Sequence, residues 1–177
     1  APQTGGKMAE HKQTVYMKGN PLTLVGEKVE AGDKAPDFTV LANDLSPKKL
    51  SAFSGKKVVL TSVPSLDTGV CSMMTNKFNA EATDLDDDTV VLTISNDLPF
   101  AQARWCGAEG VEDVHVLSDY KDVEFGQKYG MLIDELRLLG RAVFVIDKDG
   151  VVRYKQVVEE ITDEPDYEKA LEAVKNL

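Results

Sequence analysis

The sequence has few cysteines and histidines, which limits its chemistry. Two cysteines among 177 residues, Cys71 and Cys106, are too few for a disulfide scaffold and do not form a C-x-x-C pair. Zinc is not expected either, because the only histidines are His11 and His115. His115 lies in an alternating stretch, where a strand histidine without a chemical role is the better interpretation.

Basic residues are also scarce, with 20 Lys and Arg against 30 Asp and Glu and a net charge of −10. This balance disfavours nucleic acid and anionic membrane surfaces as partners. No apolar run approaches the ~18 residues that a membrane span needs. A chain that is 42% hydrophobic and 28% charged is typical of a soluble globular protein, and its length suits one domain.

The first residues, 1–12, are polar and contain no apolar core of a signal peptide. We interpret them as a disordered tail, in which residues 1–7 before Met8 are consistent with a cloning remnant. Residues 13–177 are then predicted to form a single domain. Without a signal peptide, and with so few cysteines, we expect the protein to be cytoplasmic.

Periodicity predicts strands alternating with helices. A hairpin is expected around Gly19-Asn20-Pro21, and a second one around Lys148-Asp149-Gly150. The expected strands are Thr14–Lys18, Leu22–Val25, Phe38–Leu41, Lys57–Val63, Thr89–Ser95, Val114–Leu117, Ala142–Asp147 and Val151–Val158. The expected helices run from Val70 to Leu85 and over Pro99–Cys106, Val123–Tyr129 and Tyr167–Val174. This order predicts an α/β fold with helices around a central mixed β-sheet.

The most informative segment links the buried strand at Lys57–Val63 to the next helix. Pro64 cannot donate to a strand ladder and ends the strand, and Asp67 or Thr68 is a good N-cap. Cys71 then falls in the first helical turn, where free N–H groups and the helix dipole favour an anion such as a thiolate. The plainer alternative is an inert buried cysteine.

Two further residues bear on this site. Thr68 lies three residues before Cys71, so its hydroxyl can share the space of the sulfur, besides acting as an N-cap. Cys106 is expected at the end of a short helix just before Gly107, where the dipole keeps a thiol protonated. An activated and a resting thiol form a usable redox pair, although Cys106 alone is better explained as core packing beside Trp105.

These residues resemble the active-site signature of peroxiredoxins, and more narrowly that of the bacterial thiol peroxidase (Tpx) subfamily of atypical two-cysteine peroxiredoxins. The likeness runs from about Thr14 to Leu177, with small departures at Trp105 and Gly140. It is carried by the segments Pro64–Cys71, Asp97–Gln102, Cys106–Gly110, Arg141–Val143 and Thr162–Tyr167.

The resemblance implies a thioredoxin-like fold with an added N-terminal β-hairpin. It implies that Cys71 is the peroxidatic and Cys106 the resolving cysteine, joined in an intramolecular disulfide during turnover. Thr68 and Pro64 match residues that position peroxide and shield the sulfur, and Arg141 matches the arginine that completes the pocket. The implied substrates are hydrogen peroxide and organic or lipid hydroperoxides, with thioredoxin as reductant, a homodimer as the assembly and no metal or organic cofactor.

Other functions fit the sequence less well. A thioredoxin-type disulfide oxidoreductase would have C-x-x-C, which Cys71-Ser72-Met73-Met74 does not supply. A cysteine hydrolase would have to use His115 as its base. A non-enzymatic interaction module with two incidental thiols is the remaining alternative.

Overall fold

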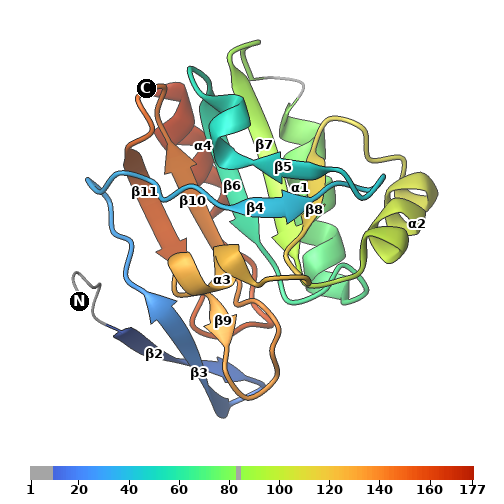
Figure 1. Cartoon of the computed structure of the whole chain (residues 1–177), viewed down its shortest axis with the longest axis vertical. Coiled ribbons are helices and arrows are strands. Elements are labelled where there is room, and N and C mark those ends of the chain that lie inside the picture. The colour runs from blue at the N-terminus through green and yellow to red at the C-terminus, as the bar shows by residue number, and fades with distance from the viewer. Residues whose placement is uncertain (1–9, 83–84) are drawn as a thin grey trace.

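The main sheet of the computed structural model, which describes residues 10–82 and 85–177, has seven strands in the order β11-β10-β6-β7-β8-β4-β5 (Figure 1). β6, β7 and β8 are parallel and the other neighbours are antiparallel, so the sheet is mixed, as expected. The strands are β4 (Thr39–Leu41), β5 (Pro47–Lys49), β6 (Lys57–Ser62), β7 (Thr89–Ser95), β8 (His115–Ser118), β10 (Ala142–Ile146) and β11 (Val152–Val157).

β6 and β7 form the buried centre of this sheet, as their β-branched runs predict. Every residue of β6 after Lys57 is buried, because β6 pairs with β7 on one side and β10 on the other. In this register Val59 lies opposite Val91 and Val145. The loop that leaves β6 therefore starts from the buried centre of the sheet.

The N-terminal hairpin is present in a second, three-stranded sheet, β2-β3-β9, at the lower end of the molecule in Figure 1. Its turn lies at Lys18 and Gly19, both with positive φ, one residue earlier than predicted. The predicted tail boundary is wrong, because residues 10–12 already belong to β2. Residues 1–9 of the tail lie outside the described residues. The strands are β2 (Glu10–Met17), β3 (Asn20–Glu27) and β9 (Leu132–Ile133).

Helices cover both faces of the main sheet (Figure 1). α1 and α4 pack on one face, where Met74, Phe78 and Leu171 meet the valines of β6, β7 and β10. On the other face Phe125 of α3 and Leu60 belong to one core cluster. α2 lies beyond β8 at the edge of the molecule, and its Trp105 joins the core on the α1 and α4 face. The helices are η1 (Leu50–Phe53), α1 (Gly69–Ala82), α2 (Pro99–Glu109), α3 (Glu124–Lys128) and α4 (Tyr167–Lys175).

Helix ends agree with the sequence at α4 and differ at α2. Asp166 caps α4 by accepting a hydrogen bond from the Lys169 N–H. The prediction that α2 stops at Cys106 is wrong: Gly107 continues the helix, and Gly110, with a φ of 67°, ends it instead. Cys106 still lies in the last turn.

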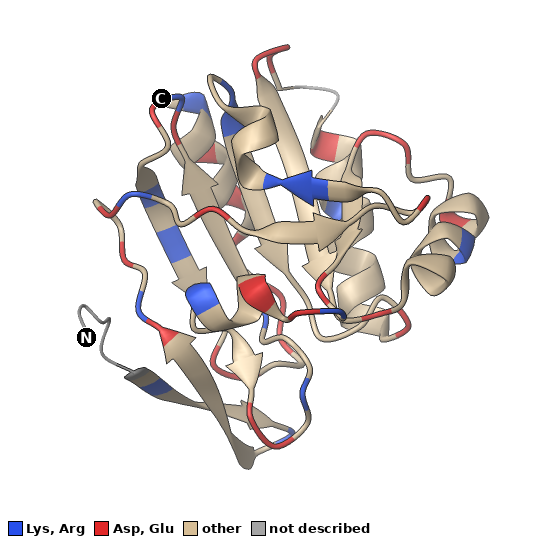
Figure 2. Ribbon diagram, in the orientation of Figure 1, with Lys and Arg blue, Asp and Glu red and all other residues tan. Residues whose placement is uncertain are grey.

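Charged residues are spread over many elements. Figure 2 shows Lys and Arg on separate elements, among them β5, β11 and α2, interspersed with Asp and Glu. Across the described part of the chain, none of the helices has both the length and the apolar character needed to cross a bilayer.

Candidate active site

Cys71 is the third residue of α1, at the carboxyl end of the buried strand β6. The N-cap of α1 is Thr68, whose carbonyl accepts the Ser72 N–H at 3.0 Å and whose hydroxyl accepts the Cys71 N–H at 3.4 Å. The amides of Gly69 and Val70 have no acceptor among the described residues. The sulfur thus belongs to a helical turn with unpaired N–H groups, which favours an anion.

The Cys71 side chain is completely buried and faces Arg141. Nη2 of Arg141 donates to Sγ of Cys71 at 3.1 Å, and Nη1 contacts Sδ of Met74 at 3.6 Å. Nε donates to the carbonyl of Ile161 at 2.7 Å and so fixes the guanidinium plane. Two sulfur atoms and one carbonyl surround the cationic group.

Arg141 is a buried cation without a carboxylate partner among the described residues, since none of their ion pairs includes it and its exposure is 2%. An isolated buried charge is costly unless an opposite charge neutralises it. The adjacent group that can become an anion is the Cys71 thiol, and a thiolate there would be the counter-ion of the guanidinium.

The sheet explains why Arg141 reaches this point. It immediately precedes β10, whose first residue, Ala142, pairs with Ser62 at the end of β6. The Ser62 hydroxyl also donates to the carbonyl of Gly140 at 2.7 Å. A Cβ on Gly140 would lie 2.8 Å from a Leu24 methyl group, so glycine allows the close packing next to Arg141.

Pro64 and Thr68 lie in the loop between β6 and α1, as predicted. Pro64 is buried directly after Val63, whose N–H still pairs with the carbonyl of Ile94. Thr68 is exposed, and its hydroxyl donates to the carbonyl of Ser65 at 3.0 Å. That hydroxyl makes no hydrogen bond to the Cys71 sulfur in the described structure.

Cys106 packs against the same core as Cys71 but makes no hydrogen bond to Cys71 or Arg141 in the described structure. Both cysteines are free thiols, and the Cys106 side chain is half-buried. Burial raises the pKa of the Cys106 thiol, although the Asn43 amide opposes the shift. A resting, protonated thiol was expected, but its cause is burial rather than the helix dipole. Cys106 lines a hollow of about 400 Å³ that also borders Lys48 and His115.

Asp97 contributes a contact to the site that the sequence did not reveal. It does not cap α2, whose N-cap is Leu98, without a side-chain cap bond. The Asp97 carboxylate instead accepts the Ser65 hydroxyl at 2.7 Å and the Leu66 N–H at 2.8 Å. The only available signal was an aspartate directly before a Leu-Pro helix start.

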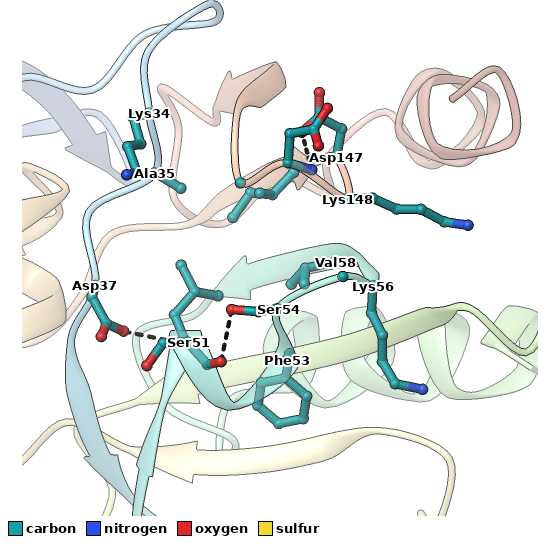
Figure 3. A pocket seen from close by; sticks show the side chains of 15 residues that line it. Lys34, Ala35, Asp37, Ser51, Phe53, Ser54, Lys56, Val58, Asp147 and Lys148 are labelled. Atoms are coloured by element: carbon teal, nitrogen blue, oxygen red, sulfur yellow. Dashed lines mark hydrogen bonds between the residues drawn. The ribbon is translucent and has the colours of Figure 1, made fainter.

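A further hollow, of about 430 Å³, lies at the opposite end of β6 (Figure 3). Asp37, Ser51, Phe53 and Lys148 line it, and none of the predicted site residues does. Asp37 accepts the Ser51 N–H at 3.0 Å, so its carboxylate is engaged in holding the chain. This hollow gives no support to chemistry at a second place.

His115 lacks the raised pKa that would make it a strong general base toward either cysteine. Its ring packs edge-on against Phe53 with centroids 5.3 Å apart. Partial burial and the nearby Lys48 charge both lower the pKa of His115.

Comparisons with known proteins identify the family of the chain. The family model described as Redoxin matches residues 30–171. The thiol peroxidase of Halalkalibacterium halodurans is 56% identical, over 92% of this chain and 97% of its own. The thiol peroxidase of Bacillus subtilis is 53% identical, with the same coverage of both chains.

A solved structure shows the same similarity in three dimensions. The peroxiredoxin-like protein from Aquifex aeolicus superposes with a TM-score of 0.87 at 42% identity, covering 94% of this chain and 98% of that one. The thioredoxin-like fold predicted from the sequence is thereby confirmed. The chain belongs to the Redoxin family and, within it, to the thiol peroxidases, which are peroxiredoxin oxidoreductases.

Proposed function

We propose that the chain reduces hydroperoxides with Cys71 as the peroxidatic nucleophile. The observation that carries this proposal is the contact of 3.1 Å between Sγ of Cys71 and a buried guanidinium without a carboxylate partner in the described structure. This position favours a thiolate, which is the nucleophilic form of cysteine. The remaining N–H groups of Arg141 and the start of α1 are suited to stabilise charge on a peroxide.

The first step is a two-electron transfer. The Cys71 thiolate attacks the terminal oxygen of the hydroperoxide, an S–O bond forms and the O–O bond breaks. The leaving oxygen takes up a proton and departs as water or an alcohol, while the sulfur becomes a sulfenic acid. Thr68 orients the peroxide through its hydroxyl oxygen, and Pro64 keeps bulk water from the sulfur.

Cys106 resolves the sulfenic acid in the second step. Its thiol attacks the Cys71 sulfur, water leaves and an intramolecular disulfide forms, which an external dithiol, thioredoxin, then reduces. The disulfide requires Cα atoms within ~7 Å. Because the two cysteines lie in different helices and the Cys71 sulfur contacts Arg141, we expect α2, the Cys71 turn or both to unwind.

Helix α2 is weakly held, which supports this motion. It has no side-chain N-cap and no charged residue that complements its dipole, and Gly107 lies in its interior. Gln102 is fully buried and donates to Ser95 and Leu117, yet its Oε1 has no hydrogen-bond partner in the described structure. Each of these features costs about 1 kcal/mol. Local opening of such a helix is an accessible motion.

Exposed apolar residues near the site support larger substrates and self-association. Leu98 and Phe100, directly after Asp97, are 51% and 66% exposed. We propose that this surface admits organic and lipid hydroperoxides as well as hydrogen peroxide, and that it borders a homodimer interface. The expected compartment is the cytoplasm, where thioredoxin keeps thiols reduced.

Two matched cysteine variants test the mechanism in an assay of peroxide-dependent oxidation of reduced thioredoxin. Cys71→Ser should abolish this activity, whereas Cys106→Ser should complete one fast turnover and then stall. Titration of free thiols should show one disulfide after one equivalent of peroxide. Steady-state activity in Cys71→Ser, or two thiols left after that equivalent, would refute the proposal.

A further inference from the structure

The loop that carries Pro64 and Thr68 is tied to Cys71 by a short chain of hydrogen bonds that starts at Asp97. The Asp97 carboxylate accepts the Ser65 hydroxyl at 2.7 Å, and the Ser65 carbonyl accepts the Thr68 hydroxyl at 3.0 Å. The Thr68 hydroxyl in turn accepts the N–H of Cys71 at 3.4 Å. Asp97 also fixes the next residue of the loop through the Leu66 N–H, at 2.8 Å.

Asp97 is itself held rigidly. Ser95, the last residue of β7, donates its hydroxyl to the carboxylate at 2.7 Å, and the Ser118 hydroxyl at the end of β8 donates to the Asp97 carbonyl. Gln102 of α2 donates to the same Ser95 hydroxyl at 3.0 Å. The carboxylate has no cationic partner in the part of the chain that the structure describes, so three neutral donors satisfy it, two from the loop and one from β7.

This arrangement places one carboxylate between the two redox segments. The hydrogen bonds of the Asp97 side chain to the loop determine where Cys71 lies relative to Arg141. The Asp97 backbone leads directly into α2, which carries Cys106. Because Asp97 is anchored on β7 and β8, unwinding of α2 can begin after it and leave the Cys71 loop in place.

We propose that Asp97 is a positioning residue for the peroxidase reaction, which holds the loop at residues 64–68 so that the Cys71 sulfur stays in contact with Arg141. This inference rests on the proposed function. Small displacements of a reacting group cost large factors in rate, on the order of 100-fold for 1 Å. Loss of the Asp97 carboxylate should therefore slow the first chemical step about tenfold or more.

The test measures that step alone, in the Cys106→Ser background. Trp105 is the only tryptophan and donates its indole N–H to Ser72 at 3.2 Å, so its fluorescence can report oxidation of the neighbouring Cys71 in stopped flow. Dimedone trapping and mass spectrometry identify the sulfenic acid. All variants are compared at a temperature at which circular dichroism shows each of them folded.

Four variants separate positioning from stability. Asp97→Ala should react about ten times more slowly or worse, and Asp97→Asn, which keeps an acceptor for the Leu66 N–H, should recover to within about threefold. Asp37→Ala is the matched control, since Asp37 also accepts backbone N–H groups but lies at the far end of β6. It should lose stability and keep its rate. Ser65→Ala replaces Asp97→Ala if the latter does not fold, and should also be slow.

The outcomes distinguish this inference from the function on which it rests. If the unsubstituted background forms no sulfenic acid, the proposed function fails. If it does, and Asp97→Ala reacts as fast as the background, the positioning role alone is refuted. A rate for Asp97→Asn as low as that of Asp97→Ala, or an equal slowing in Asp37→Ala, refutes it as well.

Discussion

Replacing Arg141 by methionine should slow the oxidation of Cys71 while leaving the free energy of unfolding nearly unchanged. The substitution keeps much of the side-chain volume and removes the charge-assisted contact of 3.1 Å to Cys71. Hydrogen bonds to charged groups contribute about 1.5–3 kcal/mol. If the whole contact acts on the thiolate and the transition state, the second-order rate of Cys71 oxidation falls about 10- to 150-fold.

The fold should respond differently from the rate. Burying a cation without a carboxylate partner is unfavourable, and apolar replacements of buried charges are often neutral or stabilising. Arg141→Met leaves the Ile161 carbonyl without its donor, which offsets part of that gain. We expect the free energy of unfolding to change by no more than about 1 kcal/mol.

Stopped-flow oxidation in the Cys106→Ser background measures the rate, and urea unfolding measures the stability. Arg153→Met is the matched control, because Arg153 is exposed and paired with Asp147. It should keep the rate of the background. An Arg141→Met variant that reacts within twofold of the background would show that the guanidinium is not the group that activates Cys71.

Three further predictions concern the surroundings of the site. Trp105→Phe removes the hydrogen bond to Ser72, so the disulfide should form several-fold faster after one equivalent of peroxide, as followed by non-reducing mass analysis. An unchanged rate would show that this hydrogen bond does not restrain α2. The Thr162 hydroxyl and the backbone N–H groups of the N-terminal hairpin turn donate to Glu160 and lower its pKa to about 2. The hairpin contact should therefore persist down to pH 4.5 and weaken as the pH falls through 2, which amide chemical shifts of Gly19 would follow. Burial raises the pKa of Asp119 to about 6, so the native state takes up a proton as the pH falls from 6 to 4. The free energy of unfolding should therefore increase as the pH falls over that range, and Asp119→Asn should lack this increase.

Local patterns were sufficient to predict the part of the site that neighbouring residues determine. The β-branched run at β6, the proline after it and the Thr68 cap act within a few residues, and together they place Cys71 in the first turn of α1. The two hairpins were found for the same reason. Helix length was less accessible, because packing and the left-handed Gly110, rather than Gly107, decide where α2 ends.

Contacts between distant segments were beyond such reasoning. Arg141 is 70 residues from Cys71, and its position depends on β10 pairing with β6. By itself the sequence around Arg141 would fit a surface ion pair, and only the resemblance to peroxiredoxins assigned it to the pocket. Asp97 reaches Ser65 across 32 residues because β7 lies beside β6, and no local pattern indicates which way its carboxylate turns.

In the reduced structure Cys71 lies in a rigid part of the fold, whereas Cys106 lies in a helix that is held less firmly. Cys71 lies where the central strands end and is fully buried, whereas α2 is tied to α1 by single hydrogen bonds such as that from Asn76 to Glu109. A neutral or exposed bond of this kind contributes about 1 kcal/mol. The peroxide-reducing geometry can therefore remain fixed while the resolving cysteine travels. Movement of α2, rather than of the Cys71–Arg141 pair, should then limit the rate of disulfide formation, and hydrogen exchange should show loss of protection in α2 before any loss in the sheet.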